Sequence, residues 1–131
     1  MKFFALGLSH RTSPLEMRES IAFTRDELPG ALQSLKGVLG DVVIISTCNR
    51  TELYSTALDG GVIQDNLTDF LGQRFPRGQE EISQCLYFYE HEEAVRHLFM
   101  VASGLDSQIL GESEILGQVR EAYSASVTQG C

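Results

Sequence analysis

The chain has 131 residues, with 10 Lys and Arg against 18 Asp and Glu, a net charge of −8, no Trp and three Cys. This length is typical of one soluble domain, which buries about two-thirds of its unfolded surface and holds a core without a disulfide or a metal. The net charge excludes a protein that binds nucleic acid through bulk positive charge. No apolar run approaches the roughly 20 residues of a membrane span, and no signal peptide is expected. The odd number of cysteines predicts free thiols in a reducing compartment, and therefore a cytoplasmic protein.

The first predicted elements are a strand and two helices. Residues 3–8 form a short apolar run closed by polar residues, which predicts a buried strand followed by a loop. Pro14 at a first helical position predicts a short helix to about Ser20. Thr24 and Glu27 have the spacing of a capping box, and the apolar stripe that follows them predicts a second helix, ended by glycines.

A hairpin, a helix and a further strand are predicted next. Residues 42–45 are all β-branched, as in a strand covered on both faces, and residues 52–57 alternate like a strand that pairs back on it. Residues 48–50 then lie at the tip of the hairpin. An apolar stripe at 63–71 predicts a helix, and residues 86–89 predict a fourth strand. The order up to residue 91 is that of a ferredoxin-like α+β fold, the split βαβ pattern βαββαβ with an antiparallel sheet and extra helices.

The pattern becomes helical after residue 91. Helices are predicted over 92–103 and 111–128, so we divide the chain into an α/β part, 1–91, and a C-terminal helical part, 92–131. The last helix is amphipathic, but no closing element follows it in the sequence. The sequence therefore predicts a piece of a longer protein.

Cys48 is the first candidate for chemistry. A thiol just past a buried strand, close to Arg50 and to loop N–H groups, is a candidate thiolate nucleophile. The alternative is a small, unreactive core residue, which is the commoner state of a free cysteine. Cys85, at the head of an apolar strand, and the terminal Cys131 are expected to be inert.

His97 is the second candidate. It shares a helical stripe with Ala94 and Val101, so it faces either a core edge or the wall of a cleft, and a structural histidine is the commoner case. A zinc site with His91 is excluded, because six residues of helix turn the two imidazoles about 240° apart, whereas ligand pairs lie at i, i+4. No metal site is expected.

The third candidate is the segment 107–114, where small and acidic residues precede a helix. The helix macrodipole alone explains Glu112 and Glu114. It does not explain the glycines that punctuate this stretch, which would suit the close approach of a ligand to the backbone. No two glycines of the chain lie at i, i+2, so a G-x-G-x-x-G dinucleotide loop is excluded.

Three segments, 7–19, 46–54 and 101–119, resemble the catalytic domain of the glutamyl-tRNA reductase family in their order and spacing. The resemblance covers almost the whole chain. It implies the reduction of glutamyl-tRNA(Glu) to glutamate-1-semialdehyde with NADPH, the first step of the five-carbon route to tetrapyrroles and heme.

The resemblance also implies roles for individual residues. Cys48 would attack the aminoacyl ester and form a glutamyl thioester, which accepts hydride more readily than an ester. Arg50 would hold the glutamate carboxylate, and His97 would act in positioning or protonation during hydride transfer. The substrate pocket would consist of Thr47, Asn49, Arg50, Ser107, Glu112, Ser113, Glu114 and Gln118.

The family's other parts and partners follow from the same resemblance. NADPH would bind to a domain absent from this chain, and the last helix would begin the spinal helix that leads to that domain and to a dimerisation domain. Implied partners are glutamyl-tRNA(Glu), glutamate-1-semialdehyde aminotransferase for product transfer and a second subunit, with no membrane.

Two other classes of function stay open. A regulatory or partner-docking module derived from the same enzyme would carry the thiol incidentally. A ferredoxin-like metal-binding or RNA-binding domain has little support from the acidic charge and the absent ligand spacing.

Overall fold

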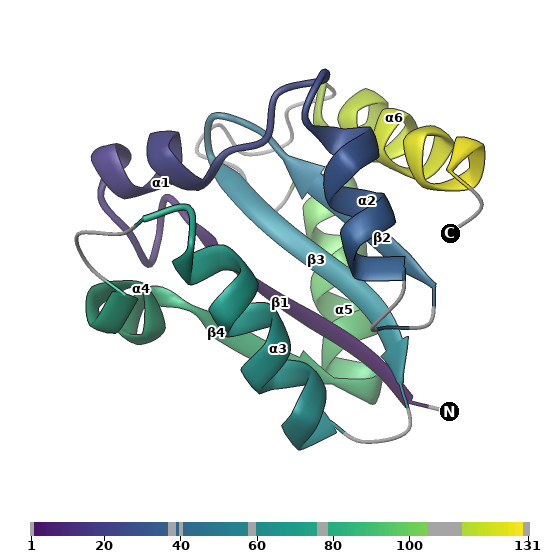
Figure 1. The fold of residues 1–131 in the computed structure, drawn as a ribbon. Helices are drawn as coiled ribbons and strands as arrows, with labels where there is room; N and C mark the ends of the chain where they lie inside the picture. Colours follow the sequence, from purple (N-terminus) through teal and green to yellow (C-terminus); the bar gives the residue numbers. More distant parts are fainter. Residues whose placement is uncertain are drawn as a thin grey trace.

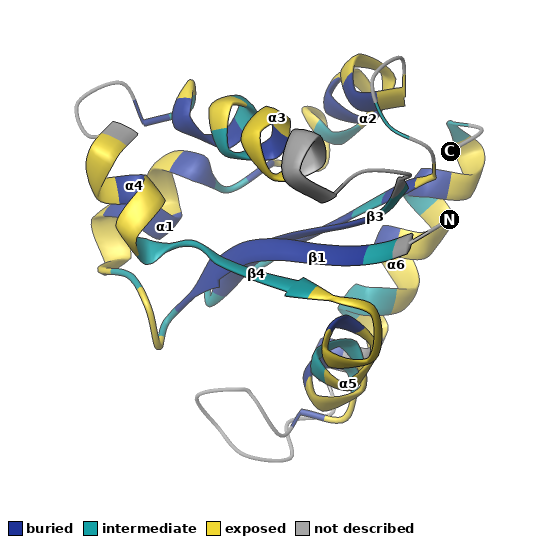
Figure 2. Ribbon diagram, turned by 90° about the horizontal axis from the view of Figure 1, so that it is seen from below, coloured by how far each residue is buried: buried dark blue, intermediate teal, exposed yellow. Residues whose placement is uncertain are grey.

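Four strands and six helices make up the computed structural model, which describes residues 2–36, 39, 41–57, 60–75, 79–104 and 114–129. The strands form one sheet, with helices on both of its faces (Figures 1 and 2). In chain order the elements are β1 (Lys2–Ser9), α1 (Leu15–Ile21), α2 (Leu28–Lys36), β2 (Val42–Ser46), β3 (Arg50–Ala57), α3 (Gly60–Gly72), α4 (Gln79–Cys85), β4 (Tyr87–Glu90), α5 (His91–Ala102) and α6 (Glu114–Thr128).

The sheet is antiparallel throughout, with the strand order β2-β3-β1-β4. β1 therefore lies in the interior of the sheet and pairs with β3 on one side and β4 on the other. Gly7 lies opposite Glu52 in β3 and opposite Tyr87 in β4. The predicted hairpin is confirmed, because β2 pairs with β3 and Ser46 lies opposite Thr51 at its closed end.

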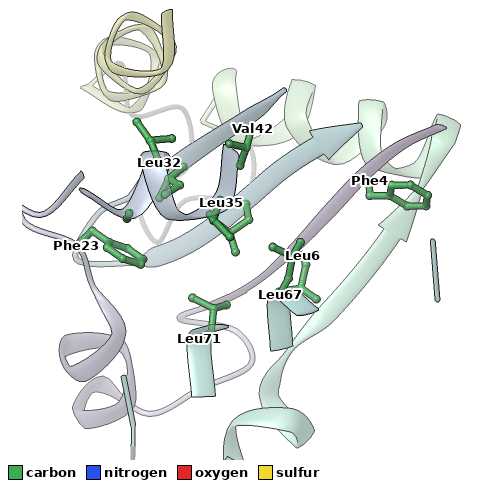
Figure 3. Close-up of a cluster of buried hydrophobic side chains, with 11 residues drawn as sticks. Phe4, Leu6, Phe23, Leu32, Leu35, Val42, Leu67 and Leu71 are labelled. Atoms are coloured by element: carbon green, nitrogen blue, oxygen red, sulfur yellow. The ribbon is translucent and has the colours of Figure 1, made fainter. Parts of the chain in front are cut away.

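One face of the sheet packs against α2 and α3. Alternate residues of each strand point to this face, as the two-residue period of a strand requires. Phe4 and Leu6 of β1 belong to this cluster together with Leu67 and Leu71 of α3 (Figure 3). The buried members are Phe4, Leu6, Phe23, Ala31, Leu32, Leu35, Val42, Ile44, Leu53, Leu67 and Leu71.

The other face packs against α5 and α6 through smaller side chains. Ala5, Ile45 and Tyr54 of the sheet meet Ala94 of α5 and Ala122 of α6. Figure 2 shows α5 on the opposite side of the sheet from α1, α3 and α4. Small residues let the helices approach this face closely, and toward the start of β3 the face becomes polar.

The helical assignments are mostly confirmed, with one omission. The segment 79–85 forms α4, which the sequence did not predict, and Cys85 ends this helix instead of heading a strand. Gly104 follows α5 with a φ of 80°, a conformation that glycine adopts without strain. None of the helices in the described part of the chain is long and apolar enough to cross a membrane.

Candidate functional site

Cys48 lies exposed in the turn between β2 and β3, where the sequence predicted it. The N–H of Thr47 donates to the carbonyl of Arg50 (2.8 Å), which closes the turn. The Thr47 hydroxyl accepts from the N–H groups of Asn49 (3.1 Å) and Arg50 (3.2 Å). From the β1–α1 loop, the N–H of His10 donates to the Asn49 carbonyl (2.8 Å). The turn that carries the thiol is therefore fixed by hydrogen bonds within the turn and by one from the β1–α1 loop.

A buried carboxylate, Glu52, lies two residues beyond this turn in β3. Its oxygen Oε1 accepts from the Tyr54 hydroxyl (2.8 Å). Its oxygen Oε2 accepts from the Tyr87 hydroxyl (2.5 Å) and from Arg50 Nη1 (3.3 Å), and it contacts Nε2 of His97. Glu52 has no exposed side-chain surface, and that of Arg50 is 1% exposed. We call Arg50, Glu52, Tyr54, Tyr87 and His97 the Glu52 cluster.

The strand pattern explains how the Glu52 cluster assembles. Alternate residues of β3 point toward α5, and the same face of β4 carries Tyr87. β1 lies between these strands, and it places Gly7 beside Glu52. A Cβ atom on Gly7 would lie 2.4 Å from the Thr51 carbonyl oxygen and 2.8 Å from Cγ of Glu52. Glycine therefore provides the space that the Glu52 side chain occupies.

Glu52 is ionised at neutral pH in this environment. Burial by itself raises the pKa of Glu52, but the hydrogen bond and charge of His97, the charge of Arg50 and the Tyr87 hydrogen bond together bring this pKa below its usual value. Burial and then the charge of Glu52 raise the pKa of Tyr54. Tyr54 is therefore a hydrogen-bond donor over the whole physiological pH range.

His97 also borders a pocket of about 310 Å³. Its ring contacts the rings of Tyr87 and Tyr89, with centroids 5.1 and 4.9 Å away. The lining residues are Ser9, Arg11, Thr12, Tyr87, Tyr89, Glu93, Arg96, His97 and Met100. Because the β1–α1 loop supplies part of this lining and is bonded to the Cys48 turn, the pocket and the thiol belong to the same end of the sheet.

Of the remaining predicted site residues, some lie in the described part of the chain and others do not. Gln118 is half-buried on α6 and borders a different pocket, of about 580 Å³, together with Ser46. Glu114 is the first residue of α6. Ser107, Glu112 and Ser113 lie outside the described residues. Among the described residues, no hydrogen bond or ring contact joins Cys48 to His97, whereas Glu52 joins His97 to Arg50.

Glu52, Tyr87 and Gly7 were missed as site residues by the sequence reasoning. The sequence did contain one signal for Glu52. Arg50, Glu52 and Tyr54 alternate along one strand and therefore share a face, and Tyr54 on that face packs in the core. A charged pair on a buried strand face is rare unless the charges are paired and serve a site. The partners from β4 and α5 could not be assigned without the strand order.

The fold and the site define a small α+β domain with an exposed thiol on a fixed turn and a histidine held by a buried carboxylate. Residues 6–131 match the family described as "Glutamyl-tRNAGlu reductase, N-terminal domain". The chain therefore belongs to the glutamyl-tRNA reductase family, as its N-terminal domain.

Individual relatives agree with this assignment. The chain is 45% identical over 129 residues to the glutamyl-tRNA reductase of Pelotomaculum thermopropionicum. The aligned region covers 97% of this chain and 29% of the relative. The chain is 46% identical over 125 residues to the glutamyl-tRNA reductase of Chromohalobacter salexigens, with 94% and 29% covered. The solved glutamyl-tRNA reductase from Methanopyrus kandleri superposes with a TM-score of 0.74 at 30% identity, over 98% of this chain and 29% of that one. The chain thus spans less than a third of these relatives.

Proposed function

We propose that this chain is the catalytic domain of an NADPH-dependent glutamyl-tRNA reductase and that Cys48 captures the glutamyl group of glutamyl-tRNA(Glu). The observation that carries the proposal is the exposed thiol of Cys48 on a turn fixed by hydrogen bonds on both sides. Cys85 is a poorer nucleophile, because burial and then the charge of Glu81 raise its pKa.

The proposed capture is a thiol–ester exchange. The Cys48 thiolate attacks the ester carbonyl carbon, a carbon–sulfur bond forms, and the bond from that carbon to the ribose oxygen breaks. The electron pair leaves on the ribose oxygen, which takes a proton, and free tRNA departs. The thioester carbonyl that remains is the electrophile for reduction to glutamate-1-semialdehyde. NADPH is placed outside this chain, whose sequence contains no G-x-G-x-x-G loop.

The substrate pocket is proposed to include the turn residues Thr47, Asn49 and Arg50, with the segment 107–114 and Gln118 completing it. Gln118 borders a pocket with Ser46, which ends the strand that leads to the turn. The Arg50 side chain is 1% exposed and ion-paired with Glu52, so a substrate carboxylate would contact it only after the side chain becomes accessible, and this contact would add to an existing ion pair.

The finer architecture belongs to the same proposal. The strand order β2-β3-β1-β4, with helices between β1 and β2 and between β3 and β4, supports a ferredoxin-like topology. We also propose the division at residue 91, a cytoplasmic location, a homodimeric whole enzyme and product transfer to glutamate-1-semialdehyde aminotransferase.

The test is transfer of labelled glutamate from its tRNA to the protein. We expect label on the wild-type chain that hydroxylamine removes, as a thioester requires, and no label on Cys48→Ser. Cys85→Ser is the matched control and should label like the wild type. An unlabelled wild-type chain, or a Cys48→Ser chain that still labels, would contradict the proposal.

A second candidate function is a partner-docking module, which the outer face of α5 favours. Val95, Phe99 and Met100 are exposed on this face, Phe99 to 71% of its surface, and they line a pocket of about 770 Å³. The two candidates differ in what happens at Cys48. If the module is purely a docking surface, glutamate gives Cys48 no protection against alkylation, whereas a substrate pocket slows that reaction.

A further inference from the structure

We propose that Glu52 is a positioning residue that fixes the tautomer of His97 in its neutral form, with the proton on Nε2 and the bare Nδ1 nitrogen available to a hydrogen-bond donor on the bound substrate. This inference rests on the proposed function, because it assigns the atom through which His97 acts in that site. It goes beyond the family assignment in naming Glu52 and the reacting nitrogen.

Glu52 has no proton to offer, because it accepts a hydrogen bond from each of its polar partners. Its oxygen Oε1 accepts from Tyr54, and its oxygen Oε2 faces the donors of Tyr87, Arg50 and His97. These four partners make up about the number of hydrogen bonds that an ionised carboxylate accepts. Its side chain has no exposed surface and cannot touch a substrate. Glu52 therefore acts through another residue.

A proton lies between Glu52 and His97. An ionised carboxylate only accepts hydrogen bonds, so the Nε2 atom that faces Oε2 must carry a hydrogen. In a neutral imidazole the other nitrogen, Nδ1, then has a free lone pair. No described residue donates to Nδ1. The structure thus assigns opposite roles to the two ring nitrogens.

The His97 ring cannot easily turn over. Tyr87 and Tyr89 contact it with centroid distances of 5.1 and 4.9 Å, and its side chain is only 11% exposed. The exposed part borders the 310 Å³ pocket, which the hydroxyl groups of Ser9 and Thr12 also line. An acceptor nitrogen among hydroxyl groups suits a hydroxyl or ammonium group of an aminoacyl ester.

The experiment is nitrogen-15 NMR of the imidazoles, since the chain has only three histidines. The spectra are recorded over a range of pH, and for the neutral form of His97 in the wild type we expect a protonated Nε2 and a bare Nδ1. Glu52→Gln removes the charge, and Glu52→Asp keeps the charge beside Arg50 but withdraws the carboxylate by one methylene. Both variants should give a mixture of tautomers. Glu92→Gln, an exposed carboxylate on the same helix, is the matched control and should leave the His97 signals unchanged.

Acyl transfer gives the second readout. If Glu52 acts only through His97, Glu52→Gln and His97→Ala should each slow labelling of Cys48 by a similar factor, about 10² or more, and the double variant should be no slower. The inference would be overturned if the double variant were slowed by the product of the two single factors. It would also be overturned if the His97 tautomer were unchanged in Glu52→Asp and Glu52→Gln. Because the tautomer is read without turnover, a wild-type chain that fails to label would contradict the proposed function alone.

Discussion

Gly7 is the residue whose small size the site depends on most directly. A methyl group on it would meet the Thr51 carbonyl oxygen at 2.4 Å and Glu52 Cγ at 2.8 Å, and the backbone of a central strand cannot easily withdraw. We predict that Gly7→Ala lowers the free energy of unfolding by about 1–3 kcal/mol, the usual cost of overpacking, and displaces Glu52. Urea unfolding measures the first effect.

The same substitution elsewhere gives a control of opposite sign. A Cβ atom on Gly30, in α2, would meet nothing within 4 Å. Gly30→Ala should therefore stabilise the protein by up to about 1 kcal/mol, because alanine is the better helix former. Equal effects of the two substitutions would show that the β1–β3 contact is not the cause.

At the residue scale, sequence reasoning located Cys48 but not its surroundings. A thiol between two strands of a tight hairpin can be placed from local pattern alone, since both strands and the turn are contiguous. The role of Glu52 depends on Tyr87 and His97, which lie 35 and 45 residues away in the sequence. Such partners become visible only when the order and register of the strands are known.

At the element scale, the start of α2 is set by a reciprocal cap. The N–H of Thr24 donates to Glu27 Oε1 (2.9 Å), and the N–H of Glu27 donates to the Thr24 hydroxyl (3.3 Å). This confirms the predicted capping box. Arg74 of the segment after α3 donates to the same carboxylate (3.0 Å), so the cap also fastens α2 to a distant part of the chain.

The charge of Glu27 predicts a pH dependence of stability. Its backbone hydrogen bond with Thr24, and then its bond with Arg74, lower the pKa of Glu27 from the usual 4.5. A group with a lowered folded-state pKa stabilises the fold above its unfolded pKa and loses this effect as the pH falls through the folded value. We predict that wild type has a higher Tm than Glu27→Gln at pH 7 and that this difference shrinks as the pH falls below 4.5 and is lost once Glu27 is protonated in both the folded and the unfolded state. A difference that persists in strong acid would contradict this, and Glu19→Gln, at an exposed position of α1, is the control.

The short helix α4 shows where element prediction from sequence fails. It has seven residues, and Ile82 is its buried apolar anchor, in a cluster with Leu8 and Phe75. One buried residue in two turns gives no periodicity to detect. The longer helices α2 and α5 were predictable because each presents an apolar stripe over several turns to the sheet.

At the scale of the whole molecule, the strand order of the sheet brings together site residues that are far apart in the sequence. β1 lies between β3 and β4, so the position of Gly7 places Glu52 and Tyr87 on either side of one small residue. α5 then closes this face and adds His97. The other face is filled by large aliphatic and aromatic side chains, whose burial stabilises the sheet (Figure 3). The apolar face thus stabilises the fold, while the candidate site lies at the polar end of the other face.

The overall charge constrains how such a site can meet a tRNA. At a net charge of −8 the chain repels a polyanion at long range, and the exposed cations beside the His97 pocket are Arg11 and Arg96. Each phosphate contact contributes a slope of about −0.7 to −0.9 to the dependence of log K on log salt. We therefore predict a slope no steeper than about −2 for glutamyl-tRNA binding to this chain, measured by salt titration, and a slope shallower by about 1 in Arg96→Gln. A slope steeper than about −5 would require many more phosphate contacts than these two arginines provide, and would mean that the chain grips the tRNA body and not only its aminoacylated end.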